Sequence, residues 1–200
     1  MAQKIPLLDL GNVVIRVDFT PFCKWVSENT DIHDYEKILG FHRSSLYYDY
    51  EFGNISTEEF INRMGKIFGT QFNPEEFQKY FCAIFPSIVD GMPELLLELE
   101  DRGVYCLSNT NLMHFEYILE NFPEIRKFKK LFASHQIHKR KPYPGIYREV
   151  AKVLEVQPQE LVFFDDSISN IEGAKKAGLF AHLFESVEQI RILVNEPELS

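Results

Sequence analysis

The sequence predicts an α/β fold in which a Rossmann-like parallel sheet forms the core and an inserted helical bundle forms a cap. A short apolar run at residues 5–8 opens the chain, and residues 19–86 then carry repeated helix-start signals without a strand pattern. From residue 93 onward, short apolar runs alternate with amphipathic segments. Because strands separated by single helices form parallel sheets with right-handed crossovers, we expect a core over residues 1–18 and 87–200 and a cap over residues 19–86.

The first expected strand and the cap helices are marked by different local signals. Ile5–Leu8 is an apolar run that ends at Asp9, which is typical of a strand buried on both faces. In the cap, four helix starts are indicated by a capping residue or by a proline at the first helical position. These starts are Thr20, Asp31, Ser56 and Asn73. We therefore expect a bundle of about four helices with no strand in this segment.

The second half of the chain alternates between expected helices and expected strands. The helices are Pro93–Arg102, Leu112–Asn121, Pro144–Leu154, Ile168–Lys176 and Val187–Val194. The strands are Val104–Leu107, Leu131–Ser134, Leu161–Phe164 and Phe180–Phe184. Gly103 and Gly178 follow two of these helices, where a left-handed C-cap is common.

Composition and charge exclude several classes of protein. The 200 residues contain 21 Lys and Arg against 30 Asp and Glu, a net charge of −9, so the surface repels nucleic acid and anionic lipid. No apolar run approaches the roughly 20 residues that a membrane helix needs, and the first residues do not resemble a signal peptide. Three separated cysteines, Cys23, Cys82 and Cys106, suggest buried free thiols in a reducing compartment. We expect a cytoplasmic protein without nucleic-acid or membrane partners.

Polar side chains stand at the ends of the expected strands. Asp9 follows the first strand, Ser108 the second, and the pair Asp165 and Asp166 the fourth, while Lys141 lies in the loop after the third. Ligand sites in open α/β sheets form at the carboxyl ends of the strands. A single Asp there is often only a helix cap worth about 1 kcal/mol. Three carboxylates together repel one another unless a cation lies among them, so this group predicts a functional site.

Four segments in this order resemble the motifs of a known enzyme superfamily. They are residues 7–14, 107–110, 140–142 and 163–170. Together they resemble the haloacid dehalogenase-like (HAD) hydrolases, and the resemblance spans nearly the whole chain, with the helical insert where the first-type cap of that superfamily lies. The Leu-Gly-Asn-Val opening and the Phe-Phe-Asp-Asp run are similar to a bacterial sugar-phosphate phosphatase branch that includes the α-D-glucose-1-phosphate phosphatase.

This resemblance implies a Mg²⁺-dependent phosphomonoesterase that acts on a small phosphorylated metabolite, with a sugar phosphate favoured. Asp9 would be the nucleophile that forms an aspartyl-phosphate. Ser108 would bind the phosphoryl group with the help of backbone N–H groups around Asn109. Lys141 would neutralise the charge that Asp9 and the phosphoryl oxygens share.

The same resemblance implies the ligands of the metal. Mg²⁺ relieves the repulsion between a carboxylate nucleophile and a phosphate, and it prefers oxygen ligands. Asp9, the backbone carbonyl of Gly11 and Asp166 would supply these, with Asp165 binding directly or through water. Asn170, one helical turn beyond Asp166, is a candidate for orienting Asp166 or Lys141, and an exposed amide is an equal alternative.

One position departs from the superfamily pattern. Many of its phosphatases carry a second Asp two residues after the nucleophile as a general acid and base, but this chain has Gly11 there. A positioned acid–base group contributes about 10²–10⁴-fold to the rate. Asp18, a metal-bound water or the phosphate of the substrate are the remaining sources of that function. For Asp18 we favour a surface or helix-capping carboxylate.

Two other functions remain open at this point. A non-catalytic phosphate- or partner-binding protein of the same fold is suggested by Gly11, although Asp9, Ser108, Lys141 and Asp166 are all present. A metal-independent 2-haloacid dehalogenase is disfavoured, because attack on a neutral carbon needs no cation to balance adjacent acidic residues.

The cap is expected to select the substrate. Most of its many aromatic residues should form its own core, because a short insert needs large side chains to bury enough area. A few of them, in a group that includes Tyr47, are candidates to face the cleft and stack on a ring of the substrate. Five polar residues are candidates for recognising hydroxyl groups, although a solvent-exposed role is favoured for them: His42, Arg43, Asp49, Glu51 and Asn54. His114, on the helix after Ser108, is a candidate to point toward the site, although a surface or helix-packing role is favoured for it.

Overall fold

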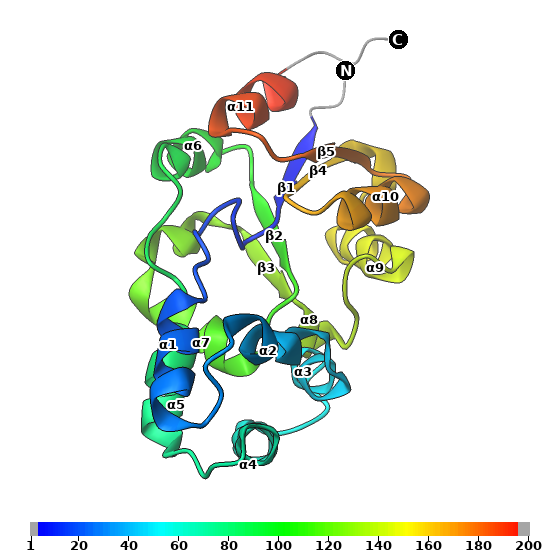
Figure 1. Ribbon diagram of the computed structural model, residues 1–200. Helices are drawn as coiled ribbons and strands as arrows, with labels where there is room; N and C mark the ends of the chain where they lie inside the picture. Colours follow the sequence, from blue (N-terminus) through cyan, green and yellow to red (C-terminus); the bar gives the residue numbers. More distant parts are fainter. Residues whose placement is uncertain (1–3, 196–200) are drawn as a thin grey trace.

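A single parallel sheet with the strand order β3-β2-β1-β4-β5 forms the centre of the computed structural model, which describes residues 4–195 (Figure 1). The four strand pairings are all parallel. The strands are β1 Ile5–Leu8, β2 Tyr105–Ser108, β3 Lys130–Ala133, β4 Leu161–Asp165 and β5 Phe180–Leu183. The α/β class is confirmed, and the observed strand ends lie within one residue of the expected ones.

The central position of β1 determines where a site can form. The chain runs from β1 to β2 and β3 on one side, and then crosses to β4 and β5 on the other. The carboxyl end of β1 is therefore the switch point of the sheet, where ligands bind in folds of this kind. Asp9 lies there, and its backbone N–H donates to the carbonyl of Phe164 at 2.8 Å.

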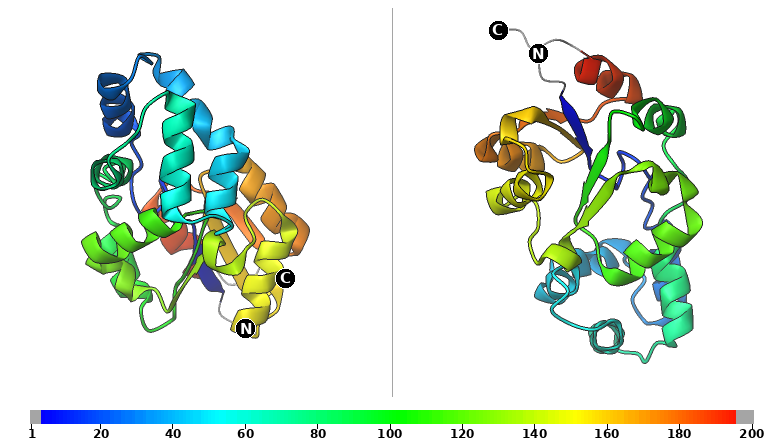
Figure 2. Two further views of the ribbon diagram at one scale, coloured as in Figure 1. Left: turned by 90° about the horizontal axis from the view of Figure 1, so that it is seen from below. Right: turned by 180° about the vertical axis from the view of Figure 1, so that it is seen from behind.

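Helices cover both faces of the sheet (Figure 2). Leu7 and Phe163 pack in one hydrophobic cluster, while the next residues, Leu8 and Phe164, pack in another. The alternation places successive side chains on opposite faces, so a continuous apolar run serves a strand that is buried on both sides. The first face is covered by α9 Pro144–Leu154 and α10 Ile168–Ala177, and the second by α6 Met92–Leu99, α7 Leu112–Asn121 and α11 Val187–Asn195.

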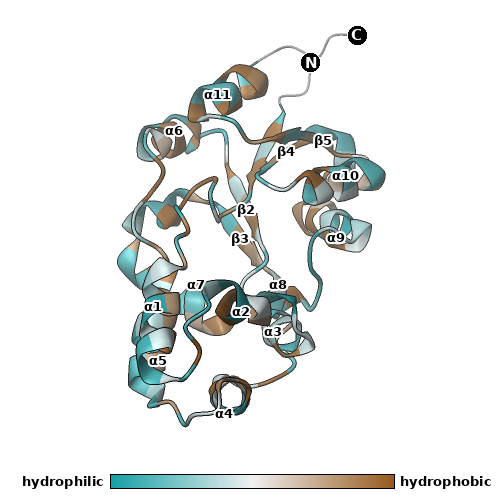
Figure 3. Ribbon diagram, viewed as in Figure 1, coloured by the Kyte–Doolittle hydropathy of each residue, from teal (hydrophilic) through white to brown (hydrophobic). Residues whose placement is uncertain are grey.

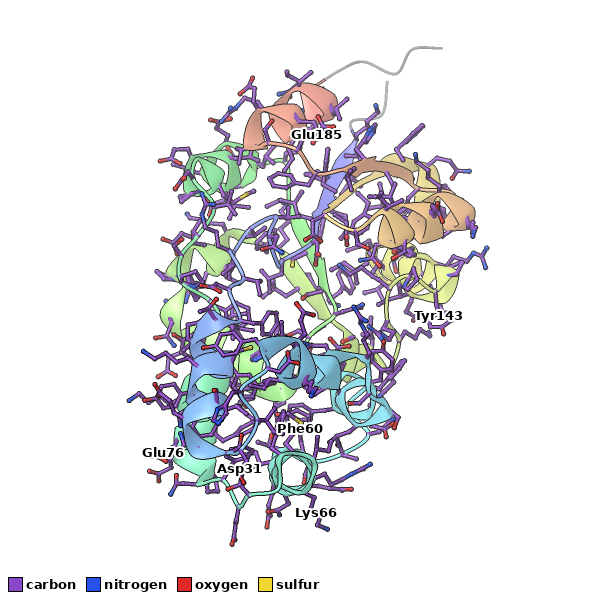
Figure 4. All side chains as sticks on the ribbon, viewed as in Figure 1. Asp31, Phe60, Lys66, Glu76, Tyr143 and Glu185 are labelled. Carbon is purple, nitrogen blue, oxygen red and sulfur yellow. The ribbon has the colours of Figure 1, made fainter. Side chains whose placement is uncertain are left out.

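The cap lies beyond the carboxyl ends of β1 and β2 and is formed by helices from the segment between these strands (Figure 1). Phe60 lies inside it, while Asp31, Lys66 and Glu76 point outward (Figure 4). Its core is largely aromatic, as expected. The helices are α1 Thr20–Asn29, α2 Tyr35–Leu39, α3 Ser45–Glu51, α4 Thr57–Phe68 and α5 Pro74–Cys82. The fully buried rings include Phe22, Phe60, Phe77 and Phe81.

Side-chain caps confirm two of the expected helix starts in the cap. Ser56 accepts a hydrogen bond from the N–H of Glu59, and Asn73 accepts from those of Glu75 and Glu76. The start expected at Asp31 is wrong. The helix α2 begins at Tyr35, because the carboxylate that accepts its first free N–H groups belongs to Asp34.

Three further elements differ from the expectation. Helix α3 was not anticipated, because its start is marked by a lone serine, Ser44, which accepts from the N–H of Tyr47 at 3.2 Å. Helix α6 ends at Leu99 rather than Arg102, since the chain turns to bring the N–H of Gly103 to the carbonyl of Leu99 at 2.9 Å. Ser134 belongs to a short helix, α8 Ser134–Ile137, rather than to β3.

Hydrophilic residues lie mainly on the outside of the protein, and the three thiols lie inside. The outer helices carry hydrophilic residues on much of their surface, while the buried strands carry apolar ones (Figure 3). Cys23, Cys82 and Cys106 are free and buried, as predicted. Among residues 4–195, no helix combines the length and apolar character that crossing a bilayer would require.

Gly173 provides a test of how closely α10 packs against the loop that carries Lys141. A Cβ atom at this position would lie 2.0 Å from the carbonyl oxygen of Pro142. We predict that Gly173→Ala lowers the free energy of unfolding by about 1–3 kcal/mol in urea titrations, because the backbone of that loop must move. Gly145→Ala is the matched control, since nothing lies within 4 Å of its Cβ position. Equal stability of the two variants would contradict the packing described.

Candidate active site

Lys141 places its ammonium group between two carboxylates at the carboxyl end of the sheet. Its Nζ atom lies 2.6 Å from Oδ1 of Asp9 and 2.6 Å from Oδ2 of Asp165. Lys141 is 1% exposed and Asp165 is fully buried. Burial by itself lowers the pKa of a lysine, but Asp9 and Asp165 reverse this effect and raise the pKa of Lys141. The ammonium is therefore charged at neutral pH, and each member of the group depends on the others for compensation.

Both oxygens of Asp165 are held by hydrogen bonds from the protein. Besides Lys141, the carboxylate accepts from the N–H of Ser167 at 2.8 Å and from Nδ2 of Asn170 at 2.9 and 3.0 Å. Asn170 thus orients Asp165, whereas the sequence suggested Asp166 or Lys141 as its partner. The reason is local: Asp165 is the last residue of β4 and points toward the first turn of α10, while Asp166 is exposed.

Asp9 is held through one oxygen atom. Its Oδ1 accepts from the N–H of Leu10 at 2.6 Å in addition to Lys141. Within the described part of the chain, Oδ2 has no hydrogen-bond partner. Burial raises the pKa of Asp9 to about 7, Lys141 opposes this shift, and Asp165 adds to it. A cation placed beside Oδ2 would favour the ionised carboxylate.

Asp9, Asp165 and Asp166 form an acidic cluster of the size that holds a metal ion. One oxygen atom from each of the three lies within 4.8 Å of the others. Asp166 is oriented by Asn12, whose Nδ2 donates to Oδ2 at 3.0 Å. Asn12 has a φ of 56°, a left-handed conformation that Asn adopts more readily than most residues. Asn12 was not singled out from the sequence, because only the folded turn shows where its side chain points.

The end of β2 is tied to the loop that carries Lys141. Nδ2 of Asn109 donates to the backbone carbonyl of Lys141 at 3.0 Å, and Oδ1 of Asn109 accepts from its N–H at 2.9 Å. Ser108, the last residue of β2, is 7% exposed. The structure therefore brings Ser108 and Asn109 to the same edge as Asp9 and Lys141, as the strand-end pattern predicted.

Gly11 and Asp18 lie close in the sequence but in different surroundings. Gly11 follows β1, two residues after Asp9, and a Cβ atom at this position would lie 3.3 Å from Cγ2 of Val17. Asp18 is exposed, and its Oδ1 accepts from the N–H of Thr20 at the start of α1 at 2.9 Å. Hydrogen bonds from Thr20 lower the pKa of Asp18. The helix-capping interpretation of Asp18 is confirmed.

A cavity of about 100 Å³ lies beside the end of β2, between the core and the cap. Gly11, Ser108 and Asn109 line it from the core, and Tyr47 lines it from α3. His114 also lines it and is 3% exposed. Its ring stacks on Phe81 of the cap, so His114 packs as expected, and it also faces the cavity rather than the surface. Tyr47 belongs to the aromatic group of the cap, a few members of which were expected to face the cleft, but the sequence did not show which ones.

Glu51 joins the cap to the loop before Lys141. It was expected to be exposed, but it is 4% exposed, and its Oε2 lies 3.2 Å from Nη2 of Arg140. The guanidinium of Arg140 also lies 4.1 Å above the ring of Tyr48. The hydroxyl of Ser134 donates to the backbone carbonyl of Glu51 at 2.8 Å. These partners are distant in the sequence, which is why the burial of Glu51 could not be foreseen.

The fold and the site define a class of capped α/β proteins with a lysine–carboxylate site at the switch point of the sheet. The family profile for haloacid dehalogenase-like hydrolases matches residues 25–178, and this chain belongs to that family. The superfamily resemblance seen in the sequence is therefore confirmed, and the protein is a hydrolase of this family.

Several known proteins are similar to the chain over most of its length. A D-ribitol-5-phosphate phosphatase of Bacteroides thetaiotaomicron is 28% identical, covering 86% of this chain and 87% of the relative. Flavin mononucleotide hydrolase 1 of Arabidopsis thaliana is 28% identical, covering 94% and 76%. A crystal structure of a HAD family enzyme from Bacteroides thetaiotaomicron, in complex with magnesium and inorganic phosphate, is 26% identical with a TM-score of 0.84, covering 94% and 98%. None of these three carries the name of the α-D-glucose-1-phosphate branch, which stays a prediction.

The buried Glu51 should give the stability of the protein a distinctive pH dependence. Burial raises its pKa from the usual 4.5 to about 7, although Arg140 and Lys141 oppose the shift. Between these two values the folded protein keeps a proton that the unfolded chain releases, so stability falls as pH rises through this interval. We predict that the melting temperature of the wild type falls relative to Glu51→Gln between pH 5 and 8.

The slope with pH is the quantity to compare, whatever the absolute stability of each variant. Glu58→Gln, at an exposed position of α4, is the matched control and should follow the wild type. If the melting temperature of Glu51→Gln changes with pH as steeply as that of the wild type, the pKa of Glu51 is not raised by burial.

Proposed function

We propose that this protein is a Mg²⁺-dependent phosphomonoesterase that hydrolyses a small phosphorylated metabolite, a sugar or polyol phosphate, through an aspartyl-phosphate intermediate. The observation that carries the proposal is the placement of Lys141 between Asp9 and Asp165, with Asp166 completing the acidic cluster. Membership of the hydrolase family supports it. The D-ribitol-5-phosphate phosphatase relative supports the substrate class, and the magnesium and phosphate in the related crystal structure support the cofactor.

The residues at the switch point fit a magnesium ion. Mg²⁺ prefers oxygen ligands and is commonly held by one or two carboxylates. Asp9, through its free oxygen, the backbone carbonyl of Gly11 and Asp166 would hold it. Asp165 would contribute through water, because its own oxygens already accept hydrogen bonds from Lys141, Ser167 and Asn170. When bound, the ion supplies positive charge that reduces the repulsion between nucleophile and phosphate and stabilises the transition state.

The side chains then divide the reaction between them. Asp9 attacks phosphorus, a P–O bond to Asp9 forms, and the ester P–O bond breaks to release the alcohol. Lys141 compensates the negative charge that the phosphoryl oxygens carry. The hydroxyl of Ser108 donates a hydrogen bond to one of these oxygens. Water then cleaves the bond between phosphorus and Asp9, which releases inorganic phosphate and restores the carboxylate.

The proton for the leaving alcohol must come from a group other than the residue two positions after Asp9, where many phosphatases of this superfamily carry a second Asp. Gly11 has no side chain to supply it, and Asp18 is occupied in capping α1. We expect water to serve instead, with a rate below that of an enzyme that has a positioned acid by about 10²–10⁴-fold. The same glycine is the observation that favours the second candidate, a phosphate-binding protein without turnover.

Phosphate release tests the proposal directly. With p-nitrophenyl phosphate and Mg²⁺, we predict that chelation by EDTA and the substitution Asp9→Asn each lower the rate at least 100-fold. Asp18→Asn is the control and should stay within about threefold of the wild type, because Asp18 only caps a helix.

The other outcomes identify the alternatives. Phosphate binding without release from a broad panel of esters would favour the binding protein. Chloride release from 2-chloropropionate that is insensitive to EDTA would favour the dehalogenase and overturn the phosphatase.

A further inference from the structure

The cavity of about 100 Å³ beside Ser108 is lined by uncharged residues. Its apolar wall comes from both core and cap and consists of Leu10, Val17, Phe19, Ile84, Phe85 and Ile118. Its polar side chains are one amide, three hydroxyls and one histidine. Because the phosphoryl group would lie at Ser108 and Asn109, this cavity is where the alcohol part of the substrate would lie. A charge on that part would lose its water without gaining a partner.

His114 is the histidine in the cavity wall, and its ring is neutral here. Its Nε2 lies 3.0 Å from the backbone carbonyl of Phe81, which requires a proton on that nitrogen. Its Nδ1 lies 3.1 Å from Nδ2 of Asn111, which therefore donates to it. Burial lowers the pKa of His114 to about 3. The ring thus adds no positive charge that would attract a carboxylate or a second phosphate.

Tyr47 is the polar group that the cap contributes to the cavity. It is 8% exposed, and its ring packs edge-on against Phe41 and His42, which leaves little freedom for the hydroxyl position. Asn111 is the polar side chain that neighbours this hydroxyl. Both ends of the Asn111 amide are engaged with His114, since Oδ1 accepts from the backbone N–H of His114 and Nδ2 donates to its ring. The phenolic proton is left to donate to a ligand.

We propose that the leaving group is a small uncharged alcohol with a free hydroxyl group, and that Tyr47 is a specificity-determining residue that hydrogen-bonds this hydroxyl. The inference rests on the proposed phosphatase function and refines its substrate class. A cavity of about 100 Å³ has room for several water-sized groups, which fits the part of a short polyol next to the phosphate. Esters that carry a carboxylate or a second phosphate on the alcohol part are disfavoured, because the cavity offers no positively charged partner.

A pair of esters that differ only in charge tests the first part. Glycerol 3-phosphate and 3-phosphoglycerate share a carbon chain and differ by a hydroxymethyl group against a carboxylate. We expect kcat/KM to be at least 100-fold higher for glycerol 3-phosphate. Equal values, a preference for 3-phosphoglycerate, or hydrolysis of neither ester by a protein that hydrolyses p-nitrophenyl phosphate would overturn the inference. Failure to hydrolyse p-nitrophenyl phosphate would instead overturn the proposed function on which it rests.

A single hydroxyl deletion tests the role of Tyr47. With glycerol 3-phosphate, Tyr47→Phe should lower kcat/KM about tenfold, because one hydrogen bond to the substrate is lost. With propyl phosphate, which lacks the free hydroxyls, the same substitution should change kcat/KM by less than about twofold. Tyr80→Phe is the control and should leave both values unchanged, because Tyr80 on α5 stacks on Trp25 of α1 and does not line the cavity. An equal effect of Tyr47→Phe on both esters, or none on either, would overturn its role in specificity.

Discussion

The site depends on the ion pairs that the buried ammonium of Lys141 forms with Asp9 and Asp165. Parallel strands bring their carboxyl ends to one edge, and β1 lies between β2 and β4, so acidic residues from distant parts of the chain meet there. Lys141 compensates two of them at 2.6 Å. Its loop is held by the side chain of Asn109 and by the close packing of Pro142 on Gly173. The position of one amino group is thus set by β2, β4 and α10 together.

Charge balance explains why the site calls for a divalent cation. One ammonium against three carboxylates leaves negative charge at the place where an anionic phosphate would bind, and a metal ion compensates both. The cap adds no charge to the adjacent cavity. Its buried carboxylate, Glu51, is paired with Arg140, while Tyr47 presents a hydroxyl. In the proposed function, the core would bind the phosphoryl group and the cap would discriminate among alcohols.

The parts of this protein that follow from local chemistry were predictable from the sequence. A short continuous apolar run such as Ile5–Leu8 is typical of a strand in a sheet that is covered on both faces. The sheet of this protein is covered in this way. Helix starts with a strong side-chain cap, at Ser56 and Asn73, form through contacts within three residues. A start with competing carboxylates was misplaced, because choosing Asp34 over Asp31 depends on how the preceding loop packs.

The sequence by itself determined the class of fold and the chemical types gathered at the sheet edge, because strand-end residues such as Asp9 and Asp165 must meet when the strands are parallel. Only the tertiary structure decided which partner each side chain takes. Asn170 holds Asp165 rather than Asp166, and Glu51 is buried by Arg140 from 89 residues away. The orientation of a side chain and its burial are set by groups that are remote along the chain, so no local pattern records them.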